Sequence, residues 1–454
     1  MRVSTLALLT LTALTPALFS AASEETRRLP PHRYTTYPYT TAGPVDPGLP
    51  QAPQQAGRNR LIIHKGGAQS ETTIAVDPTD PKHLLASSND LSNFSSFNNV
   101  QESFDGGKTW VSAGLTVNTF CYDPWLAFNA NGDAFFAYEC SDQRIAYRLA
   151  GQANWVHMTL VSGGPFPDRD MVTADTNPGS PGFNRVYIGY DEAAFNNAAH
   201  VLYSPDGKGS WVKSPTINDT SSTIGVNVAT CPNGTVHALW EDFSGRKIWA
   251  DRSNDGGATW GTDKLVTNYR LSTQSFFISI PPQPNRGILP WPFAECAPEG
   301  AAFEGRLYAS YVDKSPTSSD TDVYVRYSDD GGQTWSPEVE VDDETVNAYQ
   351  FHQSIGVGPD GTVAVAFYDT RDDATNKKTH RYISFSTDGG DTWSANERIT
   401  SGQSDESGPG DANDYGDYQG MDARPDQGFW NVWTDSRPGT SVEDVVGAAA
   451  RPTP

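Results

Sequence analysis

Cysteine and methionine are scarce in this chain, whose 454 residues contain only four of each. The four cysteines form no Cys-x-x-Cys pair and no cluster with histidine, which argues against a thiolate zinc site. Basic residues are also few, with 32 Lys and Arg against 55 Asp and Glu and a formal net charge of −23. That charge argues against binding to nucleic-acid phosphates and to anionic membranes.

Long apolar runs are absent except near the start of the chain. Arg2 precedes an apolar run over residues 6–18, and small residues follow it. This pattern predicts a signal peptide over residues 1–22, and the run is too short to span a bilayer. We therefore expect a secreted or periplasmic protein that does not insert into a membrane. Residues 23–58, rich in Pro and Thr, predict an extended linker before a domain over residues 59–454.

Glycine, proline and aromatic residues are plentiful, with 41 Gly, 32 Pro, 12 Trp, 19 Tyr and 20 Phe. This composition favours short strands and turns. The pattern Ser-x-Asp-x-Gly-x-Thr-Trp occurs intact four times, at residues 103–110, 253–260, 328–335 and 386–393. A degenerate copy lies at residues 204–211. Such repetition predicts a fold built from repeated units.

Each copy has the chemistry of a tight hairpin. Asp and Ser can accept hydrogen bonds from nearby backbone N–H groups, Gly permits positive φ, and Trp packs the turn onto its strands. The pattern resembles the Asp-box (bacterial neuraminidase repeat) of sialidases and other β-propellers, where it joins the third and fourth strands of a blade. The resemblance implies an all-β propeller. We expect the boxes to stabilise the fold rather than to bind a ligand.

A second periodic signal predicts the number of blades. Seven β-rich runs each end in an acidic residue: Asp90, Glu139, Asp191, Glu241, Asp313, Asp369 and Asp435. Taken as second strands, they predict seven four-stranded blades, with six, the usual number in sialidases, as the alternative. The last unit has only three strands and no box. A strand over residues 59–64 would complete it and close the ring, which removes free sheet edges.

The cysteines are expected to meet an oxidising compartment and to pair. Cys121 enters one predicted strand and Cys140 leaves the next, so an antiparallel hairpin would bring them together. A Cys231–Cys296 bridge would have to join two neighbouring blades. Two insertions, residues 268–288 and 401–414, each precede an innermost strand and should lie on one face of the propeller. Long loops of this kind are often functional.

Alignment of the innermost strands places reactive residue types at one equivalent position, at the mouth of the central channel. The aligned residues are Glu71, Asp123, Arg169, Gly225, Pro290, His352 and Tyr418. Ring closure would bring four of them, Tyr418, Glu71, Asp123 and Arg169, together from consecutive blades. Two carboxylates near a sugar can act as acid and base, and Arg binds a sugar carboxylate through two parallel hydrogen bonds.

The resemblance to sialidases implies specific roles for these residues. Tyr418 would be the nucleophile, Glu71 its base, and Asp123 or Asp170 the acid/base. Arg169, Arg371 and Arg437 would mimic the arginine triad that holds an acidic sugar, and His352 would also contact substrate. The chain departs from the family in one respect, because no Arg-Ile-Pro motif precedes its first box.

The leading functional hypothesis is a sialidase-like glycoside hydrolase acting on acidic sugars, on the face opposite the boxes. The alternative is a non-catalytic extracellular propeller that binds glycans or other polymers. A third reading is a polysaccharide lyase, with His352 and Tyr418 as base and acid. A carbohydrate partner and a monomeric protein are expected in each case.

No cofactor is required for hydrolysis, and no metal is assigned to the site. Acidic residues nevertheless recur around the predicted ring, and loops rich in carboxylates select calcium, so a structural calcium ion is an open expectation. Residues 411–417 superficially resemble a calcium loop but lack the spacing and terminal Glu of an EF-hand.

Overall fold

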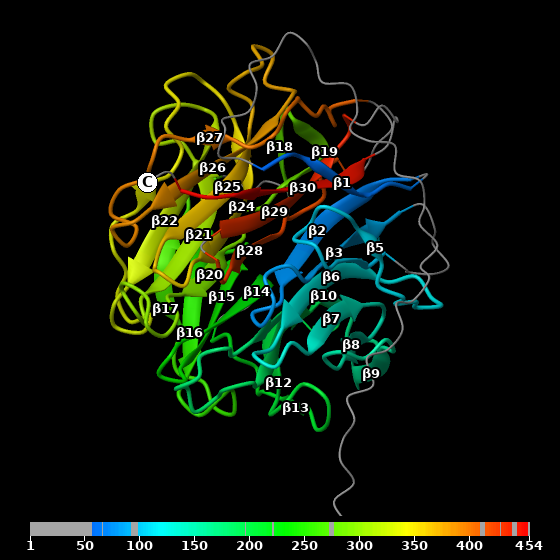
Figure 1. The fold of residues 1–454 in the computed structure, drawn as a ribbon. Helices are drawn as coiled ribbons and strands as arrows, with labels where there is room; N and C mark the ends of the chain where they lie inside the picture. Colours follow the sequence, from blue (N-terminus) through cyan, green and yellow to red (C-terminus); the bar gives the residue numbers. More distant parts are fainter. Residues whose placement is uncertain are drawn as a thin grey trace, which may run out of the picture. The chain divides into compact units, whose positions relative to one another are not determined.

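The computed structural model describes residues 57–65, 67–91, 99–195, 197–219, 222–271, 277–408, 414–426, 428–437 and 443–452. Within the compact unit Tyr39–Pro454, seven four-stranded antiparallel sheets form a ring (Figure 1). The seven-bladed β-propeller expected from the repeats is confirmed, and the six-bladed alternative is wrong. The expected signal peptide and all but the last two residues of the expected linker lie outside the described residues.

Each of the first six blades is a meander whose strands follow chain order from the axis outward. Blade one comprises β2 (Gln69–Val76), β3 (Leu84–Asp90), β4 (Gln101–Ser103) and β5 (Val111–Ser112). Blade two comprises β6 (Tyr122–Phe128), β7 (Ala134–Glu139), β8 (Gln143–Arg148) and β9 (Val156–Val161). Blade three comprises β10 (Pro167–Ala174), β11 (Val186–Glu192), β12 (Ala198–Ser204) and β13 (Val212–Lys213). Blade four comprises β14 (Thr223–Thr230), β15 (Val236–Asp242), β16 (Lys247–Ser253) and β17 (Lys264–Asn268). Blade five comprises β20 (Phe293–Cys296), β21 (Leu307–Lys314), β22 (Thr321–Ser328) and β23 (Val339–Glu340). Blade six comprises β24 (Gln350–Val357), β25 (Val363–Asp369), β26 (His380–Ser386) and β27 (Glu397–Arg398).

The seventh blade joins the two ends of the described chain. It contains β28 (Met421–Arg424), β29 (Gly428–Asp435) and β30 (Asp444–Ala450), and β1 (Arg60–Ile63) is its outer strand. β1 runs antiparallel to β30, with Arg60 opposite Gly447. The predicted closing strand is therefore confirmed. This pairing closes the ring at the seventh blade, and β30 is left with a hydrogen-bonded partner on each side, β29 and β1.

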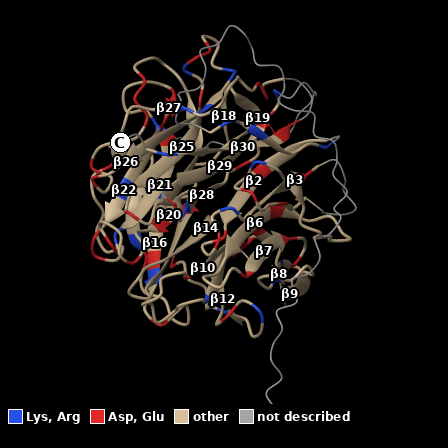
Figure 2. Cartoon of the chain, in the orientation of Figure 1, with Lys and Arg blue, Asp and Glu red and all other residues tan. Residues whose placement is uncertain are grey.

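Second strands are buried on both faces because each blade packs between two others. All seven residues of β25, Val-Ala-Val-Ala-Phe-Tyr-Asp, are buried, as are all six of β7. Such strands show a continuous apolar run rather than strict alternation. Acidic side chains outnumber basic ones and mark many loops and strand ends (Figure 2). No helix among the described residues is long and apolar enough to cross a membrane.

The Asp-boxes form the hydrogen-bonded turns expected of them. In the first box, Asp105 Oδ1 accepts hydrogen bonds from the backbone N–H groups of Lys108 and Thr109, both at 2.9 Å. Ser103 Oγ accepts from Gly107 N at 2.8 Å, and Trp110 Nε1 donates to Gly107 O at 3.2 Å. Asp255, Asp330 and Asp388 accept equivalent bonds in the other intact copies.

Each box also packs against the preceding blade. A Cβ at Gly107, whose φ is 80°, would lie 2.0 Å from the ring of Trp430 in blade seven, so only glycine fits there. In three later boxes an arginine of the preceding blade donates to a box carbonyl: Arg185 to Gly256, Arg252 to Gly331, and Arg306 to Gly389. The boxes thus tie neighbouring blades together as well as closing their own hairpins.

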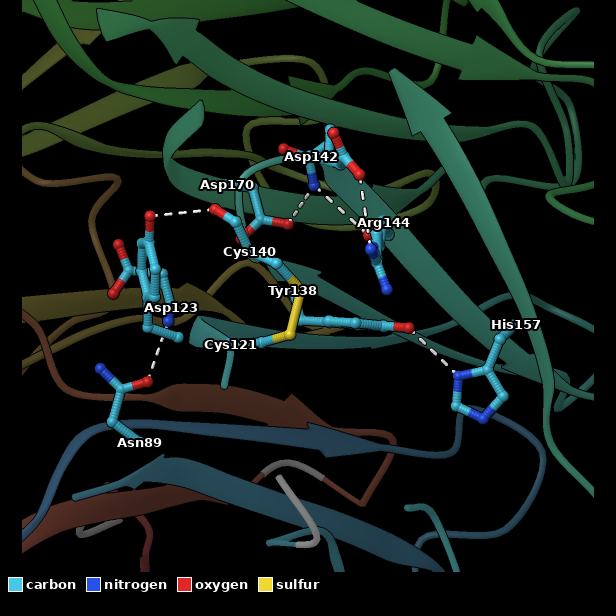
Figure 3. Close-up of a disulfide and its surroundings, with 11 residues drawn as sticks. Asn89, Cys121, Asp123, Tyr138, Cys140, Asp142, Arg144, His157 and Asp170 are labelled. Atoms are coloured by element: carbon cyan, nitrogen blue, oxygen red, sulfur yellow. Dashed lines mark hydrogen bonds and ion pairs between the residues drawn. A yellow bond between two sulfur atoms is a disulfide. The ribbon is translucent and has the colours of Figure 1, made fainter. Parts of the chain in front are cut away.

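Both expected disulfides are present. Cys121–Cys140 links the start of β6 to the residue after β7, within blade two (Figure 3). Cys231–Cys296 joins the end of the innermost strand of blade four to that of blade five. Between these two blades lies the predicted insertion. Its described part is a hairpin of β18 (Ile278–Ile280) and β19 (Gln283–Ile288), outside the seven blades.

A buried charged network links blades one and two. His83 Nδ1 lies 2.8 Å from Asp77 Oδ2, and His83 Nε2 lies 2.8 Å from Glu102 Oε1. Glu102 also accepts a hydrogen bond from Arg148 Nη1 of β8 at 3.0 Å. Because both ring nitrogens face carboxylates, the charged imidazolium satisfies both contacts. Burial opposes this charge, but the hydrogen bonds that His83 donates to Asp77 and Glu102 outweigh it and raise the pKa of His83.

We predict that this network makes stability pH-dependent in both directions. Because the pKa of His83 is raised in the folded protein, its contribution to the free energy of unfolding is fully present below the pKa of the unfolded state. That contribution is lost as pH rises through the pKa of the folded state. The pKa values of Asp77 and Glu102 are lowered by His83 despite burial, so their contribution is lost as pH falls through the folded values. His83→Gln should destabilise the protein by about 1 to 3 kcal/mol near neutral pH and remove the alkaline loss. Urea unfolding across pH measures both effects.

His64→Gln is the matched control for this prediction. The His64 side chain is 44% exposed and contacts one carboxylate, Asp444, at 2.8 Å. Solvent screens such a pair, so we expect a smaller loss of stability. A His83→Gln variant that keeps the wild-type dependence of stability on pH would contradict the prediction.

Candidate functional site

The innermost strands carry a repeated backbone irregularity at one end of the central channel. In five blades the antiparallel register shifts across a bulge, and one residue of each bulge has positive φ. These residues and their φ values are Glu71 (55°), Asp123 (50°), Arg169 (53°), Gly225 (68°) and His352 (47°). They are five of the seven positions equated in the sequence. Pro290 and Tyr418 differ, because both precede the first residue of their innermost strand.

Positive φ is unfavourable for residues other than glycine. Four such residues at equivalent positions therefore store strain of about 1 to 3 kcal/mol each. Bulges re-aim a side chain that regular pairing would hold in the sheet, and they are common beside active sites. The repeated bulge thus explains how one alignment position supplies polar side chains to the channel mouth.

Glu71 and Asp123 form a buried carboxyl pair. Their carboxyl groups lie close enough for the charge of Asp123 to act on Glu71. Asn89, in β3, orients both residues, since its Nδ2 donates to Glu71 Oε2 and its Oδ1 accepts from Asp123 N at 2.9 Å (Figure 3). Burial, followed by the charges of Asp123 and Asp417, raises the pKa of Glu71 well above its usual range.

More carboxyls surround this pair. Glu139, at the end of β7, accepts a hydrogen bond from Arg169 N at 3.3 Å, and burial followed by the charge of Asp123 raises its pKa strongly. Burial followed by Asp123 raises the pKa of Asp168 to about 7. Burial also raises the pKa of Asp170, although a hydrogen bond from Gln143 Nε2 opposes the shift. Several of these groups can therefore hold protons near neutral pH.

Arg169 lies next to the carboxyls and has an unusual environment. Its side chain is 1% exposed, and none of its three guanidinium nitrogens has a hydrogen-bond partner among the described residues. The guanidinium stacks on Trp291 at 3.7 Å, with Phe293 at 5.0 Å and Tyr418 at 5.4 Å. Burial lowers the pKa of Arg169 to about 10.

Gly225 makes room for this guanidinium. A Cβ at Gly225 would lie 2.6 Å from Arg169 Nη1, so the glycine at the equivalent position of blade four lets the arginine reach across. A buried cation without hydrogen bonds is costly and calls for a functional explanation. Arg169 is thus a candidate ligand for an anionic group.

Arg286 is a second cation at the site, and sequence reasoning missed it. It lies in β19 of the inserted hairpin and donates from Nε to Asp417 Oδ1 at 2.8 Å. Its Nη2 also pairs with Asp417 and lies 3.6 Å from Glu71 Oε1. The Arg286 side chain is 32% exposed. The signal that could have found Arg286 was the insertion over residues 268–288, which was expected on this face.

Tyr418 forms part of the floor of the site. Its side chain is 1% exposed, and its hydroxyl donates to Pro124 O at 3.3 Å. The Tyr418 ring contacts Trp125 at a centroid distance of 5.2 Å. Burial, then the charges of Asp123 and Glu71, raises the Tyr418 pKa. These contacts disfavour the phenolate that a tyrosine nucleophile requires.

His352 lies at the same end of the channel but faces a different partner. Its Nε2 lies 3.1 Å from Gln283 Oε1 of the inserted hairpin, and burial lowers the His352 pKa well below its usual range. Gln283 Nε2 in turn donates to Gly416 O at 2.8 Å. The insertion thus contacts the channel mouth at Gln283 as well as at Arg286.

Arg371 and Arg437 do not join Arg169 in a triad. Each is held by the aspartate two residues before it, at the end of a second strand. Arg371 Nε donates to Asp369 Oδ2, and Arg437 Nε to Asp435 Oδ1, both at 2.8 Å. Arg371 also pairs with Asp343, and Arg437 also contacts Asn59 and Ser401. Their expected role in binding the same sugar carboxylate has no support in this geometry.

Three of the site carboxyls could also hold a cation. One oxygen each from Asp123, Glu139 and Asp168 lie within 4.8 Å of one another. Of the calcium-like loop expected at residues 411–417, residues 411–413 lie outside the described part of the chain. Asp414 accepts hydrogen bonds from the backbone N–H groups of Asn285 and Arg286, both at 2.9 Å.

A cavity of about 400 Å³ occupies the other end of the channel. It is lined by the later residues of the innermost strands, among them Val76, Phe128, Thr230 and Val357. Trp125 and Phe293 lie between this cavity and the carboxyls, since both line the cavity and contact the site residues Tyr418 and Arg169 respectively. The site and the cavity are therefore separate features.

Comparisons with known proteins agree with the fold. The BNR/Asp-box repeat family model matches residues 326–337, which include the third intact box. No curated protein matches the sequence. A fungal alcohol oxidase of the AA5 family, solved in complex with copper, aligns at 11% identity with a TM-score of 0.52, covering 88% of this chain and 76% of its own.

Other solved structures align over less of the chain. The Fusarium graminearum α-L-arabinofuranosidase Arb93A aligns at 13% identity and a TM-score of 0.46, covering 72% of this chain and 92% of its own. The Hadza microbial sialidase Hz136 aligns at 14% identity and a TM-score of 0.43, covering 68% and 66%. At such identities the likeness concerns the fold alone.

Proposed function

We propose that this protein, a seven-bladed β-propeller of the BNR/Asp-box repeat type, is an exported glycoside hydrolase that acts on an acidic sugar. The reaction would take place at the bulged end of the innermost strands. Glycosidic bond cleavage needs a protonated carboxyl to protonate the leaving oxygen and an ionised carboxylate as base or nucleophile. We assign these two roles to Glu71, whose pKa is raised well above its usual range, and to Asp123.

The observation that carries the proposal is that two arginines lie beside Glu71 and Asp123, one buried and one partly exposed. Arg169 is buried without a hydrogen-bond partner among the described residues, and Arg286 is partly exposed above Glu71. Arginine recognises carboxylate and sulfate groups by planar hydrogen bonds, and such groups are what an acidic sugar adds to a neutral one. Carboxyls alone would equally suit a neutral sugar.

The geometry favours Glu71 as the general acid. Burial raises its pKa well above the usual range, which favours the protonated form, and Asn89 fixes its orientation. Tyr418 is assigned to positioning, because its hydroxyl is held by a backbone carbonyl and its ring lies below Arg169. This assignment differs from the role that the resemblance to sialidases implies for Tyr418.

A non-catalytic glycan-binding propeller is the second candidate. The observation in its favour is burial, since the Arg169 and Tyr418 side chains are each only 1% exposed. Groups that react must reach the bond that they cleave, whereas a recognition surface needs only Arg286 and its exposed neighbours. A polysaccharide lyase, the third candidate, would use neutral His352 as its base.

A substrate panel tests the proposal. The purified protein is incubated with fluorogenic sialosides, uronic-acid polymers and neutral glycosides of the same aglycones. We expect hydrolysis of acidic substrates, and Arg286→Met should raise KM for them at least about tenfold while leaving neutral substrates unaffected. Binding without turnover would support the non-catalytic module. An unsaturated uronate product would identify a lyase.

A further inference from the structure

A second group of carboxyls lies outside the candidate site, between blades five and six. Asp320 and Asp322 lie at the start of β22, and Asp342 and Glu344 follow β23 in the connection to β24. This acidic cluster brings one oxygen each from Asp320, Asp322 and Glu344 within 4.8 Å of one another. Asp342 lies close enough to Glu344 for the charge of Glu344 to act on it.

The cluster is buried, which separates it from an ordinary acidic surface. Asp320, Asp322 and Asp342 are 2%, 4% and 5% exposed. Isolated carboxylates are rarely buried, because removing the charge from water costs several kcal/mol unless a partner compensates it. Four carboxyls on two short segments therefore need either protons or a cation.

Several oxygens of the cluster have no hydrogen-bond partner in the described part of the chain. They are Asp320 Oδ1, Asp342 Oδ2 and Glu344 Oε2. The other oxygens of two of these residues are used locally, as Asp320 Oδ2 accepts from Ala348 N at 3.0 Å and Asp342 Oδ1 from Val323 N at 2.6 Å. Backbone contacts thus hold the aspartates while one oxygen of each stays free.

The nearest arginines are committed to other carboxylates. Arg371 Nη2 lies 3.8 Å from Glu344 Oε2, but Arg371 is hydrogen-bonded to Asp369 and to Asp343. Arg270 pairs with Glu338 at 2.7 Å and with Asp313 at 3.2 Å. Neither arginine neutralises the four carboxyls.

The geometry points to a divalent-cation site formed by Asp320, Asp322 and Glu344, with Asp342 in support, and to Ca²⁺ as its ion. Ca²⁺ binds oxygen ligands at about 2.3 to 2.6 Å, so two of its ligands lie at most about 5 Å apart. The observed spacing satisfies this limit. Ca²⁺ also tolerates irregular geometry, whereas Mg²⁺ requires a near-ideal octahedron and retains several waters.

A cation here would tie two blades together. Asp320 and Asp322 belong to blade five, and Glu344 belongs to the connection that leads into the innermost strand of blade six. Thr321 Oγ1 already donates to Gln350 O at 2.7 Å across the same junction. The ion would fix the connection over residues 341–349, on the far side of blade five from the Cys231–Cys296 bridge.

Calcium titration of the full-length protein tests this site. The protein is dialysed against a chelator and titrated with Ca²⁺ in a calorimeter, with thermal unfolding measured in parallel. We expect wild type to bind Ca²⁺ and to gain in Tm. Asp320→Asn and Glu344→Gln should each weaken binding at this site at least about tenfold and lose most of the Tm gain.

Asp343→Asn is the matched control, since Asp343 lies between two cluster residues in sequence but its side chain is 42% exposed and pairs with Arg371. It should bind Ca²⁺ as wild type does. Glu139→Gln tests the carboxyls of the candidate functional site. The inference is overturned if wild type binds no Ca²⁺ at millimolar concentration, or if only Glu139→Gln loses binding. If Asp320→Asn does not fold, Glu344→Gln decides.

Discussion

Glu71→Gln is expected to lower kcat by about 10²- to 10⁴-fold on any substrate that the wild-type protein hydrolyses. Glutamine keeps the shape of the side chain and an oxygen that can accept the hydrogen bond from Asn89, but it cannot donate a proton to a leaving group. KM should change little, because the arginines that bind the acidic group are untouched. Initial-rate kinetics at saturating substrate measure the loss.

The dependence of the rate on pH gives a second readout. A general acid works only while protonated, so kcat/KM of the wild type should fall as pH rises through the raised pKa of Glu71. The Glu71→Gln variant should lack this alkaline limb. A purely structural role for Glu71 would lower the rate without changing the shape of the profile.

Glu241→Gln is the control for this substitution. Glu241 is the strand-end carboxyl of blade four, and burial raises its pKa to about 8, but it accepts a hydrogen bond from Tyr269 at 2.8 Å rather than from a site residue. Its substitution should leave kcat within a few-fold of wild type. Equal losses in both variants would show that the effect arises from buried carboxyls in general and would contradict the assignment.

Tyr418→Phe distinguishes two chemical routes. A tyrosine nucleophile would make this variant as inactive as Glu71→Gln. The carboxyl route proposed here predicts that most activity remains, because within the described ranges the hydroxyl's hydrogen-bond partner is a backbone carbonyl, Pro124 O. A covalent tyrosyl adduct detected by mass spectrometry would overturn the carboxyl route.

Removing the Cys231–Cys296 disulfide should cost about 4 kcal/mol of unfolding free energy, against about 3 kcal/mol for Cys121–Cys140. The difference follows from loop length, since the first bridge spans 65 residues and the second 19. Alanine at both positions of each pair avoids burying a hydroxyl group. Guanidinium unfolding of the two double variants measures the two losses.

The Cys231–Cys296 bridge has a further structural reason to matter. The innermost strand of blade five, β20, has only four residues and follows the inserted hairpin, so few backbone hydrogen bonds hold it. The bridge attaches its last residue to blade four. Equal losses for both pairs, or a larger loss for Cys121–Cys140, would contradict this account.

The fold was predictable from the sequence because it is repetitive. The acidic strand ends mark every blade and the boxes mark most of them, and the missing fourth strand of the last unit pointed to residues 59–64. The Cys121–Cys140 pairing followed from the predicted hairpin, whereas the Cys231–Cys296 pairing depends on how two neighbouring blades meet. Alignment also brought out Glu71, Asp123 and Arg169 as equivalent positions, although their shared positive φ was not visible in the sequence.

The remaining parts of the site depend on features that do not repeat. Arg286 comes from an insertion, and its reach to Asp417 and Glu71 is set by the path of one hairpin. Arg371 and Arg437 seemed available because they follow second strands. Each instead folds back onto the aspartate two residues earlier, a local ion pair that forms regardless of the rest of the ring.

The seam in the seventh blade has a consequence for biosynthesis. β1 is made before the other described strands and its partner β30 after them, so their pairing cannot form until all seven blades have been synthesised. Until β30 has been made, β1 has no strand to pair with. The ring therefore cannot close until its last strand has been made.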